Sequence, residues 1–385
     1  MRIGIDLHNI RDGGGPNYIR NLLEAGDPAI DGFSEIHLFG SPRVLSWFPE
    51  RPWIVRHAFD VLDRSLPHRL WFVATKLPKL MRAAGCNLLY SPGGIAFGTF
   101  RPYVTISRNM MPFRPEFWGM YPRFSPEWFR LHLLRWVNAA SFARADGMIF
   151  LSETAHRVVS RFMSRMPTQV ATVPHGVNRE RFRPGPRPAG NGTIHIVYPS
   201  RFEPYKHQVE VVAAFATLFA EFPNLRLRLC GPANAAYLAR FKAAAQAVDP
   251  SGERIEYMGE VPNEALPGLY AQSDLLVFAS SCENLPNILI EAMACGIPIC
   301  SSDRSPMPEI ARDACLYFDP TDPDSIAASV REALSDMTAA KARADLGVHY
   351  AEEYSWARTA RRTFQFLANV ASGTSAEGGA TERVS

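Results

Sequence analysis

The sequence predicts an α/β protein made of two doubly wound parallel-sheet domains in tandem. Short apolar runs alternate with stretches of helical periodicity, and this alternation occurs twice along the chain. A Pro-, Gly- and Arg-rich stretch without periodicity, residues 178–192, separates the two halves. Strands that alternate with helices form parallel sheets covered on both faces. The 385 residues are enough for two such domains, each with its own core.

Six strands and several helices are expected in the first half, residues 1–177. The expected strands are Ile3–Leu7, Glu35–Phe39, Asn87–Tyr90, Tyr103–Ile106, Gly147–Leu151 and Gln169–Val173. The clearest helical patterns cover Asn17–Glu24, Pro67–Ala84, Pro126–Ala143 and Glu153–Phe162.

The alternation restarts after the linker, in a second domain of residues 193–353. Its expected strands are Ile194–Tyr198, Leu225–Leu229, Ile255–Met258, Leu275–Phe278, Ile297–Cys300 and Cys315–Phe318. A long amphipathic helix, 354–370, is expected to cross back to the first domain. The small and polar tail, 371–385, is expected to be disordered.

Composition limits the class of protein. The net charge of +3 is too weak to indicate nucleic-acid binding on its own. Six scattered cysteines without C-x-x-C spacing indicate free thiols in a reducing compartment and no zinc site. No signal-peptide pattern or membrane-spanning run is present. We therefore expect a cytoplasmic protein that could also lie on a membrane surface.

Ligands of doubly wound sheets bind beyond the carboxyl ends of the strands, so a cleft between the two domains is the expected site. In the first domain, a Gly-rich loop with Gly14 and Gly15 precedes a helix and could present N–H groups to an anion. A flexible surface turn is the alternative, and the spacing does not fit a dinucleotide-binding fingerprint. Arg108 and Asn109 follow a strand and are expected to point into the cleft.

Two further segments could touch the ligand. His175 and Gly176 stand at the end of the first domain; Gly176 is expected to take a special backbone geometry, and a packed hinge role for His175 is the favoured alternative. Arg201 and Lys206 follow the first strand of the second domain. Such a pair can neutralise a diphosphate, unless both are ordinary solvated charges.

The most informative stretch is "SCENLPNILIEAMACGIPIC", Ser281–Cys300. Pro286 and Gly296 bound a short helix that is apolar on nearly every face, so the helix should be buried. Burying an ionised Glu291 there costs several kcal/mol unless it is paired or hydrogen-bonded. A carboxylate accepts well from adjacent sugar hydroxyls, and Glu283 could approach the same ligand from the loop. The alternative is a structural Glu291 bonded to a backbone N–H or to Arg304.

These residues together resemble the retaining glycosyltransferases of family 4, which have the GT-B fold of two Rossmann-like domains facing across a cleft. The resemblance covers residues 1 to about 370. It rests on Glu283, seven residues and Glu291, continued by "EAMACGIPI", on "PEI" and "LYFDPTDP" further on, and on the Arg201/Lys206 pair.

The resemblance implies a nucleoside-diphosphate sugar donor, UDP- or GDP-linked, and a glycan or polyprenyl-linked acceptor, with no metal or other cofactor. Arg201, Lys206 and Glu283 are the implied catalytic residues, and Glu291 is implied to hold the ribose. The other implied donor-binding residues are Gly231, Val261, Asn284, Leu285, Pro286 and Asn287. Gly14 and Gly15 are implied to approach the phosphates and the acceptor.

The chain departs from the common family pattern at two places. Asn284–Asn287 replaces a Gly-Phe-Gly-type segment, which predicts a narrower and more polar sugar pocket. Arg108-Asn109-Met110 stands where many members carry a histidine. The contact that this histidine makes with the sugar in those members is therefore not expected in this chain. The "RNMMPF" version is similar to bacterial enzymes that build cell-surface polysaccharide, such as lipopolysaccharide and O-antigen.

Residues 101–144 are basic and aromatic, as in segments that lie on anionic membranes, and this favours a location at the inner face of the plasma membrane. A solvated Arg face over an aromatic core is the alternative. Three other functions stay open: a nucleotide-sugar 2-epimerase of the same fold, a non-catalytic sugar-nucleotide-binding protein and, with least support, an NAD-dependent oxidoreductase.

Overall fold

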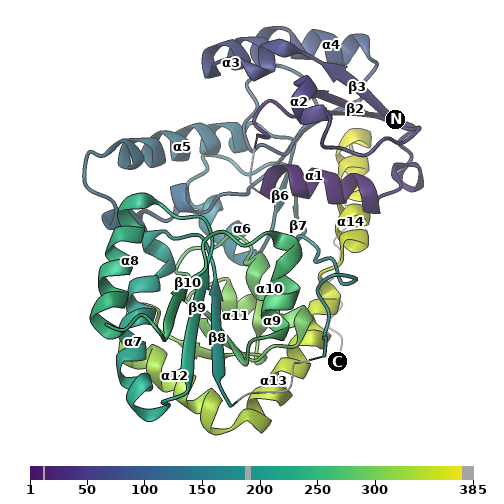
Figure 1. The fold of residues 1–385 in the computed structure, drawn as a ribbon. Coiled ribbons are helices and arrows are strands. Elements are labelled where there is room, and N and C mark those ends of the chain that lie inside the picture. The colour runs from purple at the N-terminus through teal and green to yellow at the C-terminus, as the bar shows by residue number, and fades with distance from the viewer. Residues whose placement is uncertain (12–13, 187–191, 375–385) are drawn as a thin grey trace. The chain divides into compact units, whose positions relative to one another are not determined.

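A computed structural model describes residues 1–11, 14–186 and 192–374. The chain divides into two compact units (Figure 1). Unit 1 holds residues 1–113, 129–176 and 356 onward, and unit 2 holds residues 114–128 and 177–355. The predicted cleft between the domains stays a prediction. Three parts of the chain that carry predictions lie outside the described residues: Gly13 of the expected anion loop, residues 187–191 of the linker and residues 375–385 of the tail.

Unit 1 is built on a seven-stranded sheet in the order β3-β2-β1-β4-β5-β6-β7, in which every pair is parallel. Its strands are β1 Arg2–Asp6, β2 Glu35–Gly40, β3 Ile54–Ala58, β4 Leu88–Ser91, β5 Tyr103–Ile106, β6 Gly147–Phe150 and β7 Gln169–Thr172. The sequence did not predict β3. This edge strand is half-exposed and carries Arg56 and His57, so it lacks the continuous apolar run of a central strand.

The helices of unit 1 are α1 Gly14–Ala25, α2 Pro42–Leu45, α3 Leu66–Thr75, α4 Leu77–Ala83, α5 Pro126–Ala143, whose first three residues belong to unit 2, α6 Glu153–Ser160 and α14 Trp356–Ser372. The single helix expected over Pro67–Ala84 is two helices, because Pro78 in the first turn of α4 cannot continue α3. The last helix, α14, packs against α1. It includes Ala371 and Ser372, which were expected to be disordered.

Unit 2 holds a six-stranded parallel sheet in the order β10-β9-β8-β11-β12-β13. The strands are β8 Ile194–Pro199, β9 Leu225–Cys230, β10 Ile255–Tyr257, β11 Leu275–Phe278, β12 Ile299–Ser302 and β13 Leu316–Phe318. The helices are α7 Gln208–Glu221, α8 Ala235–Val248, α9 Leu266–Ala271, α10 Asn287–Cys295, α11 Met307–Ala311, α12 Pro323–Ser335 and α13 Met337–Tyr350. All six strands were predicted, and the fold class of two doubly wound parallel sheets is confirmed.

One segment departs from the expected domain boundaries. Residues 114–128, including the 3-10 helix η4 (Pro115–Met120), pack with unit 2, although they precede the linker in the sequence. The helix η4 contacts another short helix, η5 (Pro204–Lys206). The first domain of residues 1–177 is therefore interrupted by a segment of the other unit. Among the described residues, no helix is long and apolar enough to cross a membrane.

Candidate functional site

The predicted binding residues of unit 2 gather at one edge of its sheet. Arg201 and Lys206 follow β8, Gly231 follows β9, Val261 follows β10 and Glu283 follows β11. All these strands are parallel, so their carboxyl ends share that edge. The strand order reverses between β8 and β11, and ligands of doubly wound sheets bind at such a switch point.

Lys206 and Glu283 meet at this switch point. The Lys206 ammonium and the Glu283 carboxylate form a hydrogen-bonded ion pair, with side chains that are only 8% and 16% exposed. The ammonium also lies 5.3 Å from the centre of the Tyr205 ring and 5.5 Å from that of Phe278. The backbone carbonyl of Lys206 accepts a 2.5 Å hydrogen bond from the buried Tyr198 hydroxyl. The Lys206 ammonium and the Glu283 carboxylate thus lie side by side beyond the carboxyl ends of β8 and β11.

Arg201 is exposed on a loop whose backbone is fixed. Its carbonyl accepts a 2.9 Å hydrogen bond from Gln208, and the neighbouring Phe202 is buried. The loop lies so close to Gly231 that a Cβ atom there would come within 2.2 Å of the Ser200 carbonyl oxygen. Gly231 also has φ +141°, which side-chain-bearing residues rarely adopt. The guanidinium of Arg201 is therefore accessible on a rigid support.

Glu291 is less buried than the sequence indicated. Helix α10 is not buried on every face: Asn287, Glu291 and Cys295, at helical positions i, i+4 and i+8, form its accessible stripe. The pKa of Glu291 is nevertheless raised to about 7, mainly because protein surrounds the carboxyl group. A hydrogen bond from Asn263 and the charge of Arg181 act in the opposite direction.

The alternative prediction that Glu291 pairs with Arg304 is wrong. Arg304 lies 2.7 Å from Asp319 and 3.3 Å from Asp303. Glu291 instead belongs to a short network in which Arg181 donates a 2.8 Å hydrogen bond to the Asn263 side-chain oxygen. Sequence reasoning missed Asn263 and Arg181. Little in the sequence indicated that these two residues lie near Glu291, because Arg181 is in the predicted linker and Asn263 is in a polar loop.

The segment between the two glutamates forms a compact turn. Asn284 and Leu285 are buried, and the Leu285 carbonyl accepts a 3.0 Å hydrogen bond from the Asn287 N–H. Pro286 is the residue before α10, and Gly296 ends the helix at φ 64°. Both helix boundaries predicted from Pro286 and Gly296 are confirmed.

Three predicted residues of unit 1 also come together. A Cβ atom on Gly15 would lie 3.1 Å from Nη1 of Arg108, and one on Gly14 would lie 3.6 Å from Nη2. Arg108 packs 5.9 Å from the centre of the Tyr18 ring and donates a 3.4 Å hydrogen bond to the Pro92 carbonyl. Burial lowers the pKa of Arg108, and no carboxylate of the described residues pairs with it. The N-terminus of α1 and a half-buried cation thus lie side by side.

The other unit 1 residues have structural contacts. His175 is buried and stacks on Tyr18 and Trp356, at ring distances of 4.8 and 5.7 Å, and burial lowers its pKa to about 3. It is therefore a packed, neutral histidine. Gly176 does not have a positive φ, so the special geometry expected for it is wrong. The Asn109 side chain caps the following turn through a 3.2 Å bond from the Met111 N–H.

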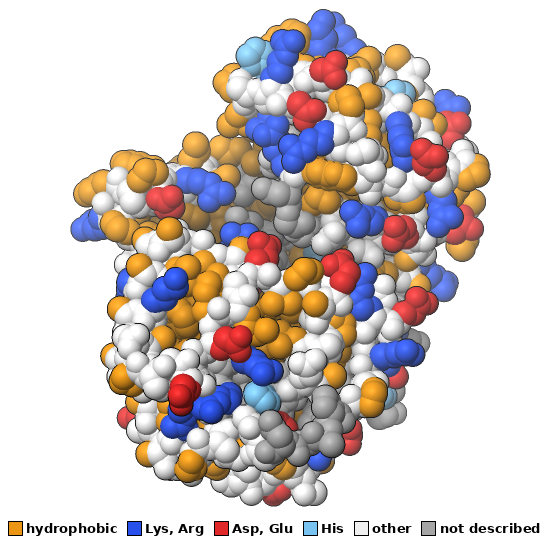
Figure 2. Space-filling model, in the orientation of Figure 1, with side chains coloured by type: hydrophobic (Ala, Val, Ile, Leu, Met, Phe, Trp, Pro, Cys, Tyr) orange, Lys and Arg blue, Asp and Glu red, His pale blue; other side chains and the backbone are white. Residues whose placement is uncertain are grey.

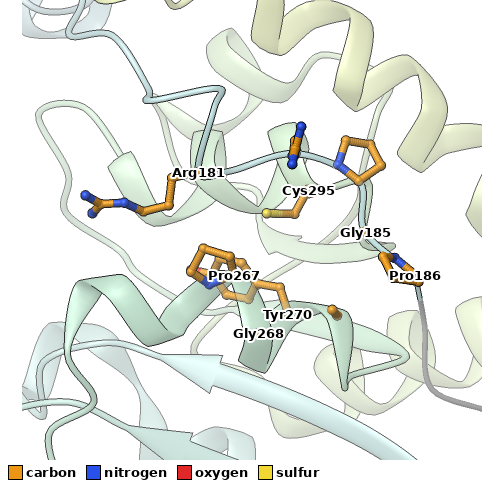
Figure 3. A pocket seen from close by; sticks show the side chains of 10 residues that line it. Arg181, Gly185, Pro186, Pro267, Gly268, Tyr270 and Cys295 are labelled. Atoms are coloured by element: carbon orange, nitrogen blue, oxygen red, sulfur yellow. The ribbon is translucent and has the colours of Figure 1, made fainter.

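Unit 2 also contains a pocket of about 370 Å³, between the loop 181–186, α9 and the end of α10 (Figure 3). Arg181, Arg183, Tyr270 and Cys295 contribute its polar lining. None of the predicted site residues lines it. It adjoins Glu291, because Arg181, Tyr270 and Cys295 of its lining all interact electrostatically with that carboxyl group.

Among residues 1–11, 14–186 and 192–374, no group of three or more His, Cys, Asp or Glu side chains is arranged to hold a metal ion. Lys206 and Arg201 are two positive charges at the carboxyl edge of unit 2.

Comparisons with known proteins identify the domain and the fold. Residues 180–349, less than half of the chain, match the family described as glycosyl transferases group 1. Unit 2 therefore carries a domain of this family. The chain is similar to sucrose-phosphate synthase from Thermosynechococcus elongatus, with a TM-score of 0.74 and 20% identity over 97% of this chain and 100% of that chain. It is also similar to Anabaena HepE in complex with UDP-glucose, with a TM-score of 0.71 and 16% identity over 96% of this chain and 100% of that chain. The chain has the GT-B fold.

Two curated relatives match parts of the chain. O-antigen chain mannosyltransferase B of Escherichia coli is 36% identical over 109 residues, which are 28% of this chain and 29% of the relative. A GDP-mannose-dependent phosphatidylinositol monomannoside mannosyltransferase of Mycolicibacterium smegmatis is 28% identical over 246 residues, 58% of this chain and 62% of the relative. Each alignment spans less than two thirds of the relative's length.

Proposed function

We propose that the chain is a retaining glycosyltransferase of family 4. It would move a sugar from a nucleoside-diphosphate sugar to a hydroxyl group of a glycan or lipid-linked acceptor. The observation that carries this proposal is the grouping of Arg201, the Lys206–Glu283 pair and Glu291 around the β8/β11 switch point. The group 1 domain match over residues 180–349 supports it.

Arg201, Lys206 and the N-terminus of α10 would bind the diphosphate of the donor. Arg201 can bind two phosphate oxygens through its planar fork, while Lys206 acts as a point charge. The free N–H groups at the N-terminus of α10 add further donors. Gly231 lets the loop that carries Arg201 pack closely against the end of β9, because a Cβ atom there would collide with the Ser200 carbonyl oxygen. Two cations supply the charge that a magnesium ion would otherwise supply, so we expect no metal requirement.

The nucleoside is assigned to the accessible stripe of α10. The Glu291 carboxylate is held from one side by Asn263, which leaves acceptor capacity for two ribose hydroxyls. Val261 precedes Asn263 on the same loop and is placed beside the base. Glu283 and the Asn284–Asn287 turn are assigned to the donor sugar. Because Glu283 is paired with Lys206, sugar and diphosphate binding are expected to be coupled.

The expected reaction breaks the bond between the anomeric carbon and the phosphate oxygen. The acceptor hydroxyl attacks the oxocarbenium-like carbon from the same face and gives its proton to a departing phosphate oxygen. Arg201 and Lys206 stabilise the charge that develops on the nucleoside diphosphate. This arrangement retains the anomeric configuration and needs no enzyme nucleophile, although Glu283 is placed where one could act.

Relatives guide the choice of substrate. A curated relative is named as GDP-mannose-dependent, and a structural neighbour holds UDP-glucose. We therefore propose a UDP- or GDP-linked hexose as donor. The O-antigen enzyme among the relatives favours a surface polysaccharide or lipopolysaccharide acceptor. In unit 1, Gly14, Gly15, Arg108 and Asn109 are assigned to the donor phosphates and the acceptor.

A membrane-bound acceptor would place the protein at the cytoplasmic face of the plasma membrane. Residues 101–144 were expected to make that contact. Phe113 and Trp118 of this segment are core residues, which leaves Phe129, Leu133 and Trp136 as exposed apolar side chains of α5. We keep membrane contact through this part of α5 as part of the proposal.

The test measures nucleoside diphosphate release by the full chain from UDP-, GDP-, dTDP- and ADP-sugars, with and without a lipid-linked glycan extract. Release from one donor that requires the extract is the expected result, and both Arg201→Ala and Glu291→Ala should abolish it. Lys242→Ala, an exposed lysine of α8, is the matched control. Turnover unchanged in both site variants would overturn the proposal. Conversion of the donor sugar without any acceptor would identify an epimerase instead.

A further inference from the structure

The positive charge of the chain is concentrated in one acid-free segment. Residues 64–115 contain no Asp or Glu but eight Lys and Arg. The other residues carry 33 Lys and Arg against 38 Asp and Glu, a net charge of −5, so this segment outweighs the rest of the chain. The eight cations are Arg64, Arg69, Lys76, Lys79, Arg82, Arg101, Arg108 and Arg114.

Three of these cations, spaced three residues apart, are exposed at the junction of α3 with α4 and along α4. Lys76, Lys79 and Arg82 are exposed, and none of them forms an ion pair within the described part of the chain. Aromatic rings support two of them: Lys76 lies 5.5 Å from the centre of the Trp71 ring and Arg82 lies 5.8 Å from that of Phe100. The nearest acidic residues in the sequence, Asp60 and Asp63, lie in the short helix that precedes α3.

The same two helices expose large apolar side chains. Trp71 is 54% exposed and Leu66 is 52% exposed. The opposite faces of α3 and α4 are in the core, where Phe72, Val73 and Met81 are buried. Trp71 and Leu66 are therefore not needed to close the core. We call Leu66, Trp71, Lys76, Lys79 and Arg82 the α3–α4 surface; Figure 2 shows blue and orange side chains together over the part of unit 1 where Figure 1 places these helices.

We propose that the α3–α4 surface docks on an anionic lipid membrane. Exposed lysines and arginines near an anionic leaflet each strengthen binding about fivefold. The exposed tryptophan and leucine side chains of α3 supply apolar surface of the kind that interfacial helices bury at the headgroup level. A nucleic-acid or acidic-protein ligand would account for the cations alone. The mixture of unpaired cations with an exposed Trp and Leu is what favours the membrane.

This inference does not depend on sugar transfer, nor on the contact proposed for α5. It assigns the lipid contact to a part of unit 1 that precedes residues 101–144. If both surfaces bind, they act as two separate contacts; if only one binds, the variants below identify which.

The experiment is flotation of the purified full chain with vesicles of phosphatidylcholine, with and without phosphatidylglycerol. We expect binding that requires phosphatidylglycerol and falls on the order of 100-fold in a Lys76→Glu, Lys79→Glu, Arg82→Glu variant. Trp71→Ser should weaken binding on the order of tenfold without removing its dependence on phosphatidylglycerol. Lys242→Glu with Lys341→Glu, on exposed positions of unit 2, is the control for charge reversal elsewhere on the chain and should bind like the parent chain.

Three results would overturn the inference. The first is a triple variant that keeps the parent affinity, and the second is parent binding that does not depend on phosphatidylglycerol. The third is loss of binding in Leu133→Ser with Trp136→Ser while the triple variant binds normally, which would place the membrane contact on α5. Since all the replaced side chains are exposed, unchanged thermal unfolding of each variant is the check that its fold is intact.

Discussion

Lys206 of unit 2 and Arg108 of unit 1 both lie at the carboxyl edge of their sheet, but they differ in their partners. In unit 2, Lys206 forms an ion pair with Glu283 in a largely buried setting. In unit 1, Arg108 is held by the Tyr18 ring and the Pro92 carbonyl, and no described carboxylate pairs with it. Phosphate binding is thus predicted both for Lys206, which has a carboxylate partner, and for Arg108, which has none among the described residues.

This difference has an energetic consequence. A buried pair is costly to break because the remaining charge keeps its desolvation penalty without its partner. An unpaired buried cation already carries that penalty, and an incoming anion relieves it. We therefore expect Lys206 to matter for both stability and ligand binding, and Arg108 to matter mainly for binding.

The largest expected effect is that of Lys206→Ala. It leaves the Glu283 carboxylate without its partner, so the free energy of unfolding should fall by about 3 kcal/mol. Urea denaturation at pH 7.5 measures this change. Lys206→Ala combined with Glu283→Gln should recover part of the loss. A single variant as stable as the parent chain would show that the pair contributes little.

Arg108→Met should behave in the opposite way. Removal of a half-buried cation without a carboxylate partner should lower the free energy of unfolding by less than about 1 kcal/mol, or raise it. Donor turnover should nevertheless fall by at least about tenfold, since the phosphate loses a charged donor. Urea denaturation and nucleoside diphosphate release measure the two effects. A loss of stability as large as that of Lys206→Ala would remove the distinction between the two units.

Glu291 should give unit 2 a pH dependence. Its pKa is about 7 in the folded chain, against an ordinary value of 4.5. Between pH 4.5 and pH 7 the folded state therefore keeps a proton that the unfolded state has lost. The stabilisation is complete below pH 4.5 and is lost as the pH rises toward 7, by about 2 to 3 kcal/mol. Glu291→Gln should remove this slope in urea denaturation curves taken from pH 5 to 8.

The same carboxyl group should link pH to nucleotide binding. Ribose hydroxyls donate to the ionised carboxylate, so affinity for a nucleoside diphosphate should rise through pH 7 and binding should release a proton. Calorimetry in two buffers of different ionisation enthalpy measures that proton. Equal enthalpies in both buffers for the parent chain would argue against a ribose contact by Glu291.

The smallest expected effect comes from the glycines of unit 1. Gly15→Ala places a Cβ 3.1 Å from the Arg108 guanidinium and should shift it by a few tenths of an ångström, which lowers donor turnover a few-fold. Gly14→Ala makes only an ordinary 3.6 Å contact and is the matched control. Equal turnover in both variants would mean that the position of Arg108 is not critical.

The sequence predicted the sheets and the residues at their edges well, because buried parallel strands are continuous apolar runs. Edge strand β3 was missed because Arg56 and His57 interrupt such a run. The pairing of Lys206 with Glu283 could not be predicted. The two residues are 77 positions apart and meet only because β8 and β11 are neighbours in the sheet.

The partners of Glu291 show a second limit of sequence reasoning. Its apolar neighbours suggested full burial, whereas Asn287, Glu291 and Cys295 share one accessible stripe of α10. Asn263 and Arg181 come from loops without periodicity, and nothing in their spacing points to a carboxylate. Side-chain networks between loops depend on tertiary packing, which local patterns do not encode.

The central claim is that the carboxyl edge of unit 2 binds a nucleoside diphosphate. Titration calorimetry of the full chain with UDP and with GDP, repeated with Arg201→Ala and Lys242→Ala, tests it most directly. The account predicts binding of at least one of the two nucleotides, weakened about tenfold or more by Arg201→Ala and unchanged by Lys242→Ala. Binding of neither nucleotide, or equal affinity in the parent chain and in Arg201→Ala, would contradict it.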